Sequence, residues 1–456
     1  MAIPFNRFKG EFTDDHDDDW TIYLRDESLS GDLNRGPILQ ASGFNVEWNA
    51  VNQDIKGGNM PSKCTVSILV HQFDIASVWD VIIASNEGDL WIDIRDKNGA
   101  YYWVGEILIE QCSKSDAGKF IVGLDTLPFE ITLVASDRIA IARDIPCDFV
   151  PGGANNYSFK THFEAIIPEF LNNLSFWPSG EPIVNFSHYW RTTEISSGTI
   201  PTFWEQKVGM DDNIFGMPNL FDQLHEMAVT FNARFVYADH QFWFFPMLPF
   251  PGETAGDYFT NFYEYNAAGF GILNSMFLYM LTPSGQYYNR TRTLAYRNPN
   301  GSLASPFNLG APVINLIAPV KKVTATGASV GVRTTTNSIT SSKTIDVGSF
   351  DHMEQPEMRS KNSQSQANWV SSSSANWRTT NSGTSYFFLQ LTTKVIADHH
   401  LQTRREINFT SLTTGEQGGI KPHYVIKYDD VYYLPVRVNY EANSGISKVR
   451  AIEIQS

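Results

Sequence analysis

Short stretches in which apolar and polar side chains alternate constrain this fold most strongly. Between residues 101 and 107, and again between 129 and 135, bulky apolar side chains return at about every second position, as at Phe129, Ile131 and Leu133. Successive side chains of a β-strand point to opposite faces of its sheet, so this period of two predicts strands with one buried face. This part of the chain is therefore expected to be a β-domain.

A hairpin connects two of the predicted strands. Residues 90–95 and 101–109 flank the sequence Asp96-Lys97-Asn98-Gly99, and Asn-Gly between two strand-like runs is a strong hairpin signal. Residues 73–85 carry apolar side chains at helical spacing and predict a short helix across one end of a barrel. We therefore predict an N-terminal antiparallel β-barrel or sandwich over residues 1–150.

Composition places the whole chain in a mainly β class with a smaller helical part. Its 456 residues are enough for several domains, and aromatic residues are abundant (31 Phe, 19 Tyr and 11 Trp) while only 18% are charged. With 34 basic against 49 acidic residues, the net charge of −15 argues against a general nucleic-acid-binding surface. A negative wall would let DNA slide through a duct without sticking, but an acidic balance is equally ordinary for a soluble protein.

Cysteine usage and hydropathy indicate a protein folded in a reducing compartment. Cys64, Cys112 and Cys147 are odd in number and widely spaced, which predicts free thiols and no disulfide framework. The N-terminus lacks a signal-peptide pattern, and the apolar run 272–281 is interrupted by Asn274 and Ser275. We expect no membrane-spanning segment.

A second region, residues 151–251, combines helices with an aromatic hairpin. Thr161 and Glu164 have the spacing of a capping box before an apolar stripe, and Asn219 is a candidate N-cap for a second helix. Phenylalanine, tyrosine and tryptophan then crowd residues 234–245 around a central Asp-His pair. The pattern predicts a small helix-plus-hairpin domain.

The remaining sequence divides into an insert and a closing module. Residues 252–385 are rich in Ser, Thr, Asn and Tyr and predict an inserted, exposed β region with long loops. Residues 386–402 have helical spacing, and the strand-like runs that follow complete a C-terminal part over 386–456. Because strands of one domain can come from distant stretches, the first and last parts of the chain may form one body.

Two sequence patterns resemble enzyme motifs but lack their context. Ser329 lies in a Gly-Ala-Ser-Val-Gly sequence like a nucleophile elbow, yet no helix follows it. His225-Glu226 begins a zinc-protease motif, but position 229 is Val where the second histidine is needed. We expect Ser329 to be structural and His225 to lie on the solvated face of its helix.

Two clusters of polar residues also fall short of metal sites. Asp398-His399-His400 contains residue types that bind metals, but neighbouring residues on a helix point in different directions and no third ligand is evident. This favours a solvated helix end. The acidic run from Asp14 to Asp19 lacks the spacing of a calcium loop and is interpreted as a mobile arm or a subunit-contact loop. We therefore predict no catalytic residue, no metal site and no cofactor.

The strands of the first domain, the aromatic hairpin and the closing module together resemble the tail hub, or baseplate hub, proteins of bacteriophages. The relevant stretches are Tyr-Tyr-Trp-Val-Gly-Glu-Ile at 101–107, Phe-Glu-Ile-Thr-Leu-Val-Ala-Ser-Asp-Arg-Ile at 129–139, and residues 234–245. The resemblance implies a virion structural protein that self-associates as a trimer or sixfold ring. Its partners would be tail-tube, fibre or adaptor, and tip proteins, with DNA only in transit through the channel. It would fold in the host cytoplasm and then reside in the tail.

A carbohydrate-binding tail adhesin is the alternative function. The repeated Ala-Asn-Trp places Trp369 and Trp377 eight residues apart, on one face if the segment is a single strand. Aromatic rings stack on sugars, but they are equally enriched in subunit interfaces. A cell-wall hydrolase is the third possibility, and no pair of residues in the sequence is a candidate for its chemistry.

Overall fold

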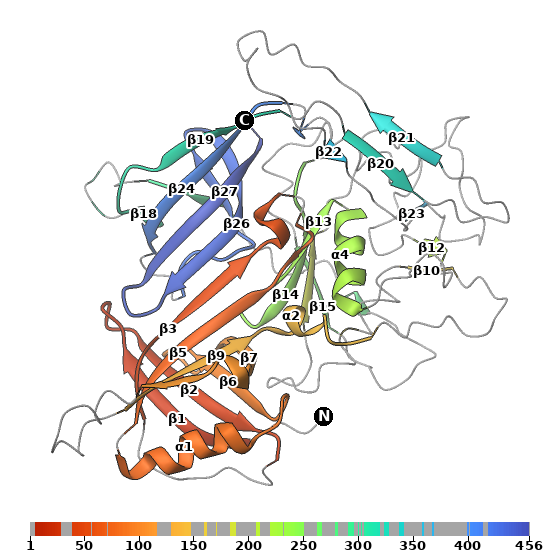
Figure 1. Cartoon of the computed structure of the whole chain (residues 1–456). Coiled ribbons are helices and arrows are strands. Elements are labelled where there is room, and N and C mark those ends of the chain that lie inside the picture. The colour runs from red at the N-terminus through yellow and green to blue at the C-terminus, as the bar shows by residue number, and fades with distance from the viewer. Residues whose placement is uncertain are drawn as a thin grey trace.

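A computed structural model gives the fold of the chain (Figure 1). The larger described segments are residues 5–28, 39–55, 57–70, 72–115, 129–146, 219–230, 232–249, 305–319, 402–413 and 418–455. Shorter described pieces are 159–161, 170, 183–187, 207–209, 262–266, 279–280, 291–295, 300, 302, 323–327, 337–341, 358–359, 367–368 and 399–400. The protein is mainly β, as the sequence predicts.

The N-terminal part is a sheet that closes on itself. The strands follow one another in the order β1-β2-β6-β7-β9-β5-β3, and a parallel pairing of β1 with β3 joins the two ends. Helix α1 lies at one end of this barrel, as predicted (Figure 1). The bounds are β1 Phe5–Thr13, β2 Asp19–Asp26, β3 Leu39–Asn49, β5 Ser62–Val70, α1 Gln72–Ala84, β6 Leu90–Arg95, β7 Tyr101–Ile107, β8 Ser113–Ser115 and β9 Phe129–Ser136.

The predicted hairpin between β6 and β7 is confirmed. Gly99 has a φ of 76°, which only glycine adopts without strain, and the Asp96 carboxylate accepts hydrogen bonds from the backbone N–H groups of Asn98 and Ala100. Two features therefore set the register of β6 and β7: the conformation of the Asp96–Gly99 turn and the alternation of buried side chains along the strands.

The C-terminal strands continue the same sheet and form a second closed β body. β3 pairs with β26 from Arg437↔Asn49 to Glu441↔Asn45, which joins the first and last parts of the chain as expected. β26 also pairs with β27 and β25, and a bridge between Ala295 and Phe307 links β17 to β18. The bounds are β17 Thr291–Thr293, β18 Phe307–Asn308, β19 Val313–Ile317, β24 Arg404–Leu412, β25 Val425–Tyr428, β26 Val431–Glu441 and β27 Ile446–Gln455.

A smaller sheet, in the order β16-β15-β11-β14-β13-β4, packs against both closed bodies. The predicted N-cap is confirmed, because the Asn219 side chain accepts a hydrogen bond of 2.9 Å from the backbone N–H of Asp222 at the start of α4. The aromatic hairpin is confirmed as β13 and β14. The bounds are β4 Asn59–Met60, β11 Ile183–Ser187, α4 Leu220–Thr230, β13 Ala233–Ala238, β14 Gln241–Pro246, β15 Phe262–Asn266 and β16 Tyr279–Met280.

Other described elements are small. They comprise the helical turns η1 Val51–Gln53, η2 Ile109–Gln111 and α2 Arg138–Ile141, and the short strands β10 Phe159–Thr161, β12 Lys207–Gly209, β20 Val323–Gly327, β21 Asn337–Ser341, β22 Met358–Arg359 and β23 Ala367–Asn368. The predicted helices at 161–174 and 386–402 fall almost wholly outside the described residues, and the predicted boundaries at 150, 251 and 385 remain predictions.

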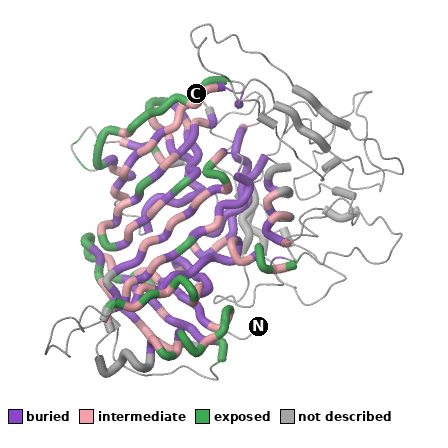
Figure 2. Tube along the Cα trace, viewed as in Figure 1, coloured by how far each residue is buried: buried purple, intermediate pink, exposed green. Residues whose placement is uncertain are grey.

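One hydrophobic core runs through the two closed bodies and the smaller sheet. Buried residues concentrate where these sheets meet (Figure 2). The Trp20 ring lies 4.9 Å from Phe44 and 5.2 Å from Tyr102 between ring centroids, and Tyr440 of β26 lies 6.1 Å from Tyr102. Aromatic side chains from both ends of the sequence therefore pack in one interior.

Candidate functional site

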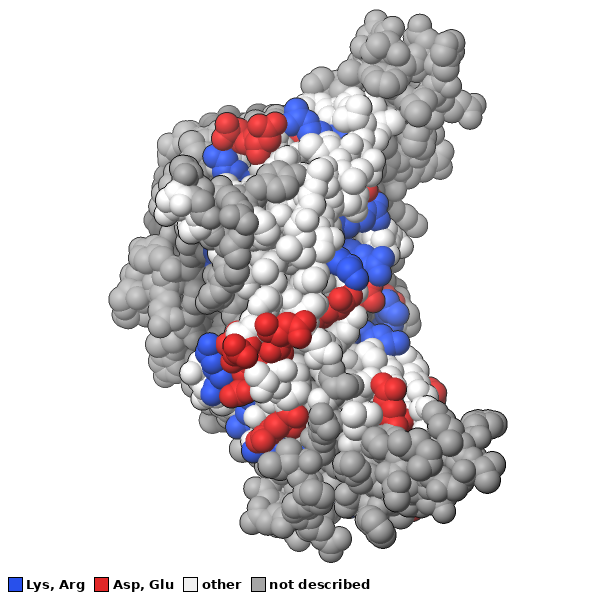
Figure 3. Space-filling model, turned by 90° about the vertical axis from the view of Figure 1, so that its left-hand side faces the viewer, with Lys and Arg blue, Asp and Glu red and all other residues white. Residues whose placement is uncertain are grey.

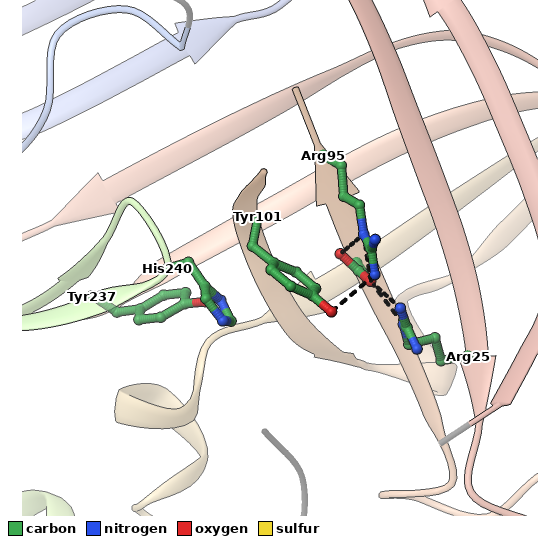
Figure 4. A network of polar contacts seen from close by, with 6 residues as sticks. Arg25, Arg95, Tyr101, Tyr237 and His240 are labelled. Atoms are coloured by element: carbon green, nitrogen blue, oxygen red, sulfur yellow. Dashed lines mark hydrogen bonds and ion pairs between the residues drawn. The ribbon is translucent and has the colours of Figure 1, made fainter. Parts of the chain in front are cut away.

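A buried charged cluster ties the strands of the N-terminal barrel together (Figure 4). Asp93 of β6 has no exposed surface, and its carboxylate accepts hydrogen bonds from Arg25 Nε at 2.7 Å and Arg95 Nη2 at 3.1 Å. The Arg95 guanidinium also lies 4.2 Å from the Tyr101 ring centroid and donates to the Tyr101 hydroxyl at 2.9 Å. Two guanidinium groups bonded to one carboxylate leave the cluster little freedom to rearrange.

The same cluster reaches the aromatic hairpin through His240. The imidazole stacks on Tyr101 with ring centroids 4.6 Å apart, and its Nδ1 lies 3.0 Å from the Tyr237 hydroxyl (Figure 4). Burial, with the nearby charge of Arg95, lowers the pKa of His240 to about 3, so the ring is neutral at physiological pH. Asp239 and His240 both have positive φ values, 52° and 59°, as a two-residue hairpin turn between twisted strands requires.

A second joint connects the hairpin to the C-terminal body. Lys421 is 4% exposed, forms an ion pair of 2.7 Å with Asp239, and has its ammonium 4.1 Å from the Tyr102 ring centroid. The ion pair with Lys421 offsets the desolvation of Asp239 and lowers the pKa of that carboxyl. His423 stacks on Trp243 with centroids 4.0 Å apart. These contacts attach the hairpin to both closed bodies.

Arg234 completes the connection from within the smaller sheet. Its fully buried guanidinium donates to the backbone oxygens of Gly57, at 3.2 Å, and of Pro435. Burial lowers the pKa of Arg234 to about 9, which still leaves it charged at neutral pH. A buried cation held by carbonyl oxygens of two different segments fixes β13 against β26 and the loop before β4.

The most unusual exposed element is strand β19. Among the described residues, the large hydrophobic side chains on the surface are Ile83 of α1 and a group around β19: Leu309, Val313, Ile314 and Leu316. Val313 is 57% and Leu316 65% exposed, although both belong to a regular strand paired with β24. The segment from Asn298 to Val320 contains no charged residue.

A hollow of about 490 Å³ adjoins β19 on the outer face of the C-terminal sheet. Figure 3 looks onto the side of the molecule that carries β18, β19 and β24 in Figure 1, and a broad uncharged area lies there above a band of acidic side chains. The hollow is bordered by Val313 and by three basic side chains that retain 34–55% of their exposure, Arg437, Lys448 and Arg450. The hollow therefore has an apolar side chain and positively charged side chains at its border.

The acidic run near the N-terminus begins with a buried aspartate that closes a turn, so the interpretation as a mobile arm was wrong, whereas the alternative of a subunit-contact loop stays a prediction. Asp14 is 7% exposed, and its carboxylate accepts hydrogen bonds from the backbone N–H groups of His16 and Asp18 and from Trp20 Nε1 at 3.0 Å. The first aspartate of the run therefore closes the β1–β2 turn over the core.

The predicted solvated helix end at Asp398-His399-His400 was also wrong for the two histidines. His400 is 1% exposed, and His399 Nε2 donates to the backbone oxygen of Glu453 at 2.6 Å. Burial and the neighbouring His400 hold the pKa of His399 well below its usual value. The two rings lie 5.1 Å apart between centroids. Within the described segments no three His, Cys, Asp or Glu side chains are grouped to hold a metal ion.

The other predicted site residues are only partly placed. Trp369, Trp377 and Ser329 lie outside the described residues. His225 is partly buried on α4, and burial lowers its pKa, so it does not lie on a fully solvated face. Cys64 is a buried free thiol and Cys112 a partly buried one, as predicted, while Cys147 is outside the described residues. No helix in the described part of the chain is long and apolar enough to cross a bilayer.

No protein family and no curated protein matches the sequence. Solved structures do match the fold. Over almost its whole length the chain aligns with phage tail proteins. The 43 kDa tail protein of prophage MuSo2 from Shewanella oneidensis is 9% identical, with 94% of this chain and 96% of that chain covered and a TM-score of 0.41. The prophage tail protein gp18 from Listeria monocytogenes is 9% identical, with 94% of each chain covered and a TM-score of 0.42.

A third match is the E. coli c3393 protein, a type VI secretion component described as similar to the T4 bacteriophage tail proteins gp27 and gp5. It is 10% identical, with 95% of this chain and 76% of that chain covered and a TM-score of 0.38. Identities this low transfer no residue's role to this chain.

Proposed function

We propose that this chain is a structural protein of a bacteriophage tail, a hub or baseplate component that assembles into a ring around the DNA channel. The observation that carries the proposal is the fusion of two closed β bodies into one sheet through β3 and β26, with buried polar joints on either side of the seam. A body built in this way is suited to transmitting load, because the β3–β26 pairing, the Lys421–Asp239 ion pair and the hydrogen bonds of Arg234 all oppose a shift of one part against another.

The two closed bodies also make the predicted symmetry physically reasonable. Each chain supplies a barrel closed by β1 and β3 and a second sheet closed by the bridge from Ala295 to Phe307. Three copies about a threefold axis would therefore place six closed β bodies around a channel. A ring of this kind sits between tail-tube and tip or fibre proteins, and its excess of acidic residues lets DNA pass without adhering.

Solution mass tests this proposal. Light scattering on the full chain over a range of concentrations should give a defined multiple of 51.4 kDa that does not change when cell-wall sugars are added. A monomer that binds those sugars, and loses them when Trp369 and Trp377 are replaced by Ala, would contradict the hub proposal and favour a carbohydrate-binding adhesin.

A further inference from the structure

The exposed apolar side chains of the described residues lie at two opposite ends of the molecule. Leu309, Val313, Ile314 and Leu316 gather at β18 and β19, and Ile83, 61% exposed, lies near the end of α1. Figure 1 shows β19 at the top of the C-terminal body and α1 at the far end of the N-terminal barrel. Isolated exposed apolar residues are ordinary on a surface, but a strand with several of them is typical of a contact surface.

The two ends also differ in charge. The β19 end borders the hollow with Arg437, Lys448 and Arg450, whereas the exposed Asp80 precedes Ile83 by three positions on α1 and therefore lies on the same side of the helix. Glu87, also exposed, follows the end of the helix. One end thus offers an apolar strand beside basic groups, and the other offers an apolar side chain beside acidic groups.

The two arginines of the hollow can bind further carboxylates without losing the ones they already hold, and Lys448 is paired with Glu441. Arg450 is paired with Glu406 at 2.7 Å and Arg437 with Glu47 at 2.6 Å, yet both arginine side chains are more than 30% exposed. A guanidinium has five N–H donors, so it can bind a carboxylate of its own chain and one from a neighbour at the same time.

We propose that the α1 end of one copy of this chain, with Asp80 and Ile83, docks against β19 and the adjoining basic hollow of the next copy. The proposal rests on the proposed function, since it names the surfaces through which the copies associate. A contact between two different surfaces is repeated from copy to copy. It forms a closed ring when the rotation that relates neighbouring copies divides a full turn evenly. The uncharged stretch around β19 lets two chains of net charge −15 approach where repulsion is smallest.

Single charged substitutions on the exposed positions test the contact. In Leu316→Glu and in Ile83→Glu the new carboxylate lies on the surface of the free chain, so folding is retained, but it is desolvated in the docked pair. Each variant should lose association over the concentrations at which the unaltered chain associates. Ser113→Glu is the matched control, because it adds the same charge at an exposed position of β8, which belongs to neither surface.

Mixing the two variants is the decisive step. Leu316→Glu retains an intact α1 end and Ile83→Glu retains an intact β19 end, so an equimolar mixture should form a 1:1 dimer and nothing larger. If the mixture stays monomeric, or if both variants keep the mass of the unaltered chain, the assignment of these surfaces is wrong while self-association stands. If the unaltered chain is itself monomeric at every concentration, the ring proposal fails and this contact fails with it.

Discussion

Removing the Asp93 carboxylate should destabilise the N-terminal barrel severely. Arg25 has a side chain only 5% exposed, and its counter-charge in the structure is Asp93, which has no exposure at all. Replacing Asp93 by Leu leaves the Arg25 guanidinium buried without that counter-charge. Arg95 is affected less, because its side chain is 22% exposed and it still lies over the rings of Tyr101 and Tyr23.

The expected size of the effect follows from this burial. Breaking a buried ion pair by removing one partner costs about 3–5 kcal/mol, whereas replacing both partners by apolar groups is often close to neutral. We therefore expect Asp93→Leu to lower the free energy of unfolding by about 4 kcal/mol, and the double variant Arg25→Met, Asp93→Leu to recover at least half of that loss.

Urea unfolding followed by tryptophan emission measures this difference. Trp20, Trp91 and Trp103 are buried in this barrel and should report its opening. With a denaturant slope of about 3 kcal/mol per molar, the midpoint of the single variant should fall by roughly 1 M or more. Lys97→Met, which removes an exposed ion pair with Asp18 on the same barrel, is the control and should hardly move it. A double variant no more stable than Asp93→Leu would refute the reasoning.

Three further predictions follow from other buried groups. Gly105→Ala should cost about 1–3 kcal/mol in thermal or urea unfolding, because the new Cβ would lie 2.5 Å from the backbone oxygen of Ser136; unchanged stability would contradict this crowding. Arg234→Met should cost about 3 kcal/mol by leaving buried carbonyl oxygens such as that of Pro435 without their donor, and a neutral outcome by urea unfolding would count against the joint. Burial lowers the pKa of His240 to about 3 in the folded chain, whereas an unfolded histidine titrates at about 6.5. Between these two values only the unfolded chain binds this proton, so the free energy of unfolding should fall on acidification by up to about 1.4 kcal/mol per pH unit. His240→Asn, which tolerates the positive φ of the turn, should show a shallower loss in melts from pH 7 to 4.5; identical slopes would exclude His240 as the titrating group.

Local patterns in the sequence were sufficient to predict several of the strands and turns. Alternation identified β7 and β9, the Asn98-Gly99 pair identified the hairpin before β7, and Asn219 identified the start of α4. Each of these features depends on residues close together in sequence, so the signal is complete within a short window.

The joints and the contact surface could not be predicted, because they depend on pairings between distant residues. Nothing in the sequence near Asp93 indicates that Arg25, sixty-eight positions earlier, will face it. The burial of Asp14 could not be predicted either, because a run of aspartates ordinarily indicates a solvated loop. Asp14 is buried because its carboxylate accepts a hydrogen bond from the buried Trp20 indole. Strand β19 lies in a range predicted as an inserted, exposed β region with long loops, but nothing in that range indicates that the strand pairs with β24 of the closing module.

Electron microscopy of the purified full-length chain tests the central claim most directly. Class averages viewed along the symmetry axis should show a closed ring with a central hole, built of three copies with six β bodies around it. Particles that are single protomers, or pairs related by a twofold axis with no channel, would contradict the account of this protein as a tail hub ring.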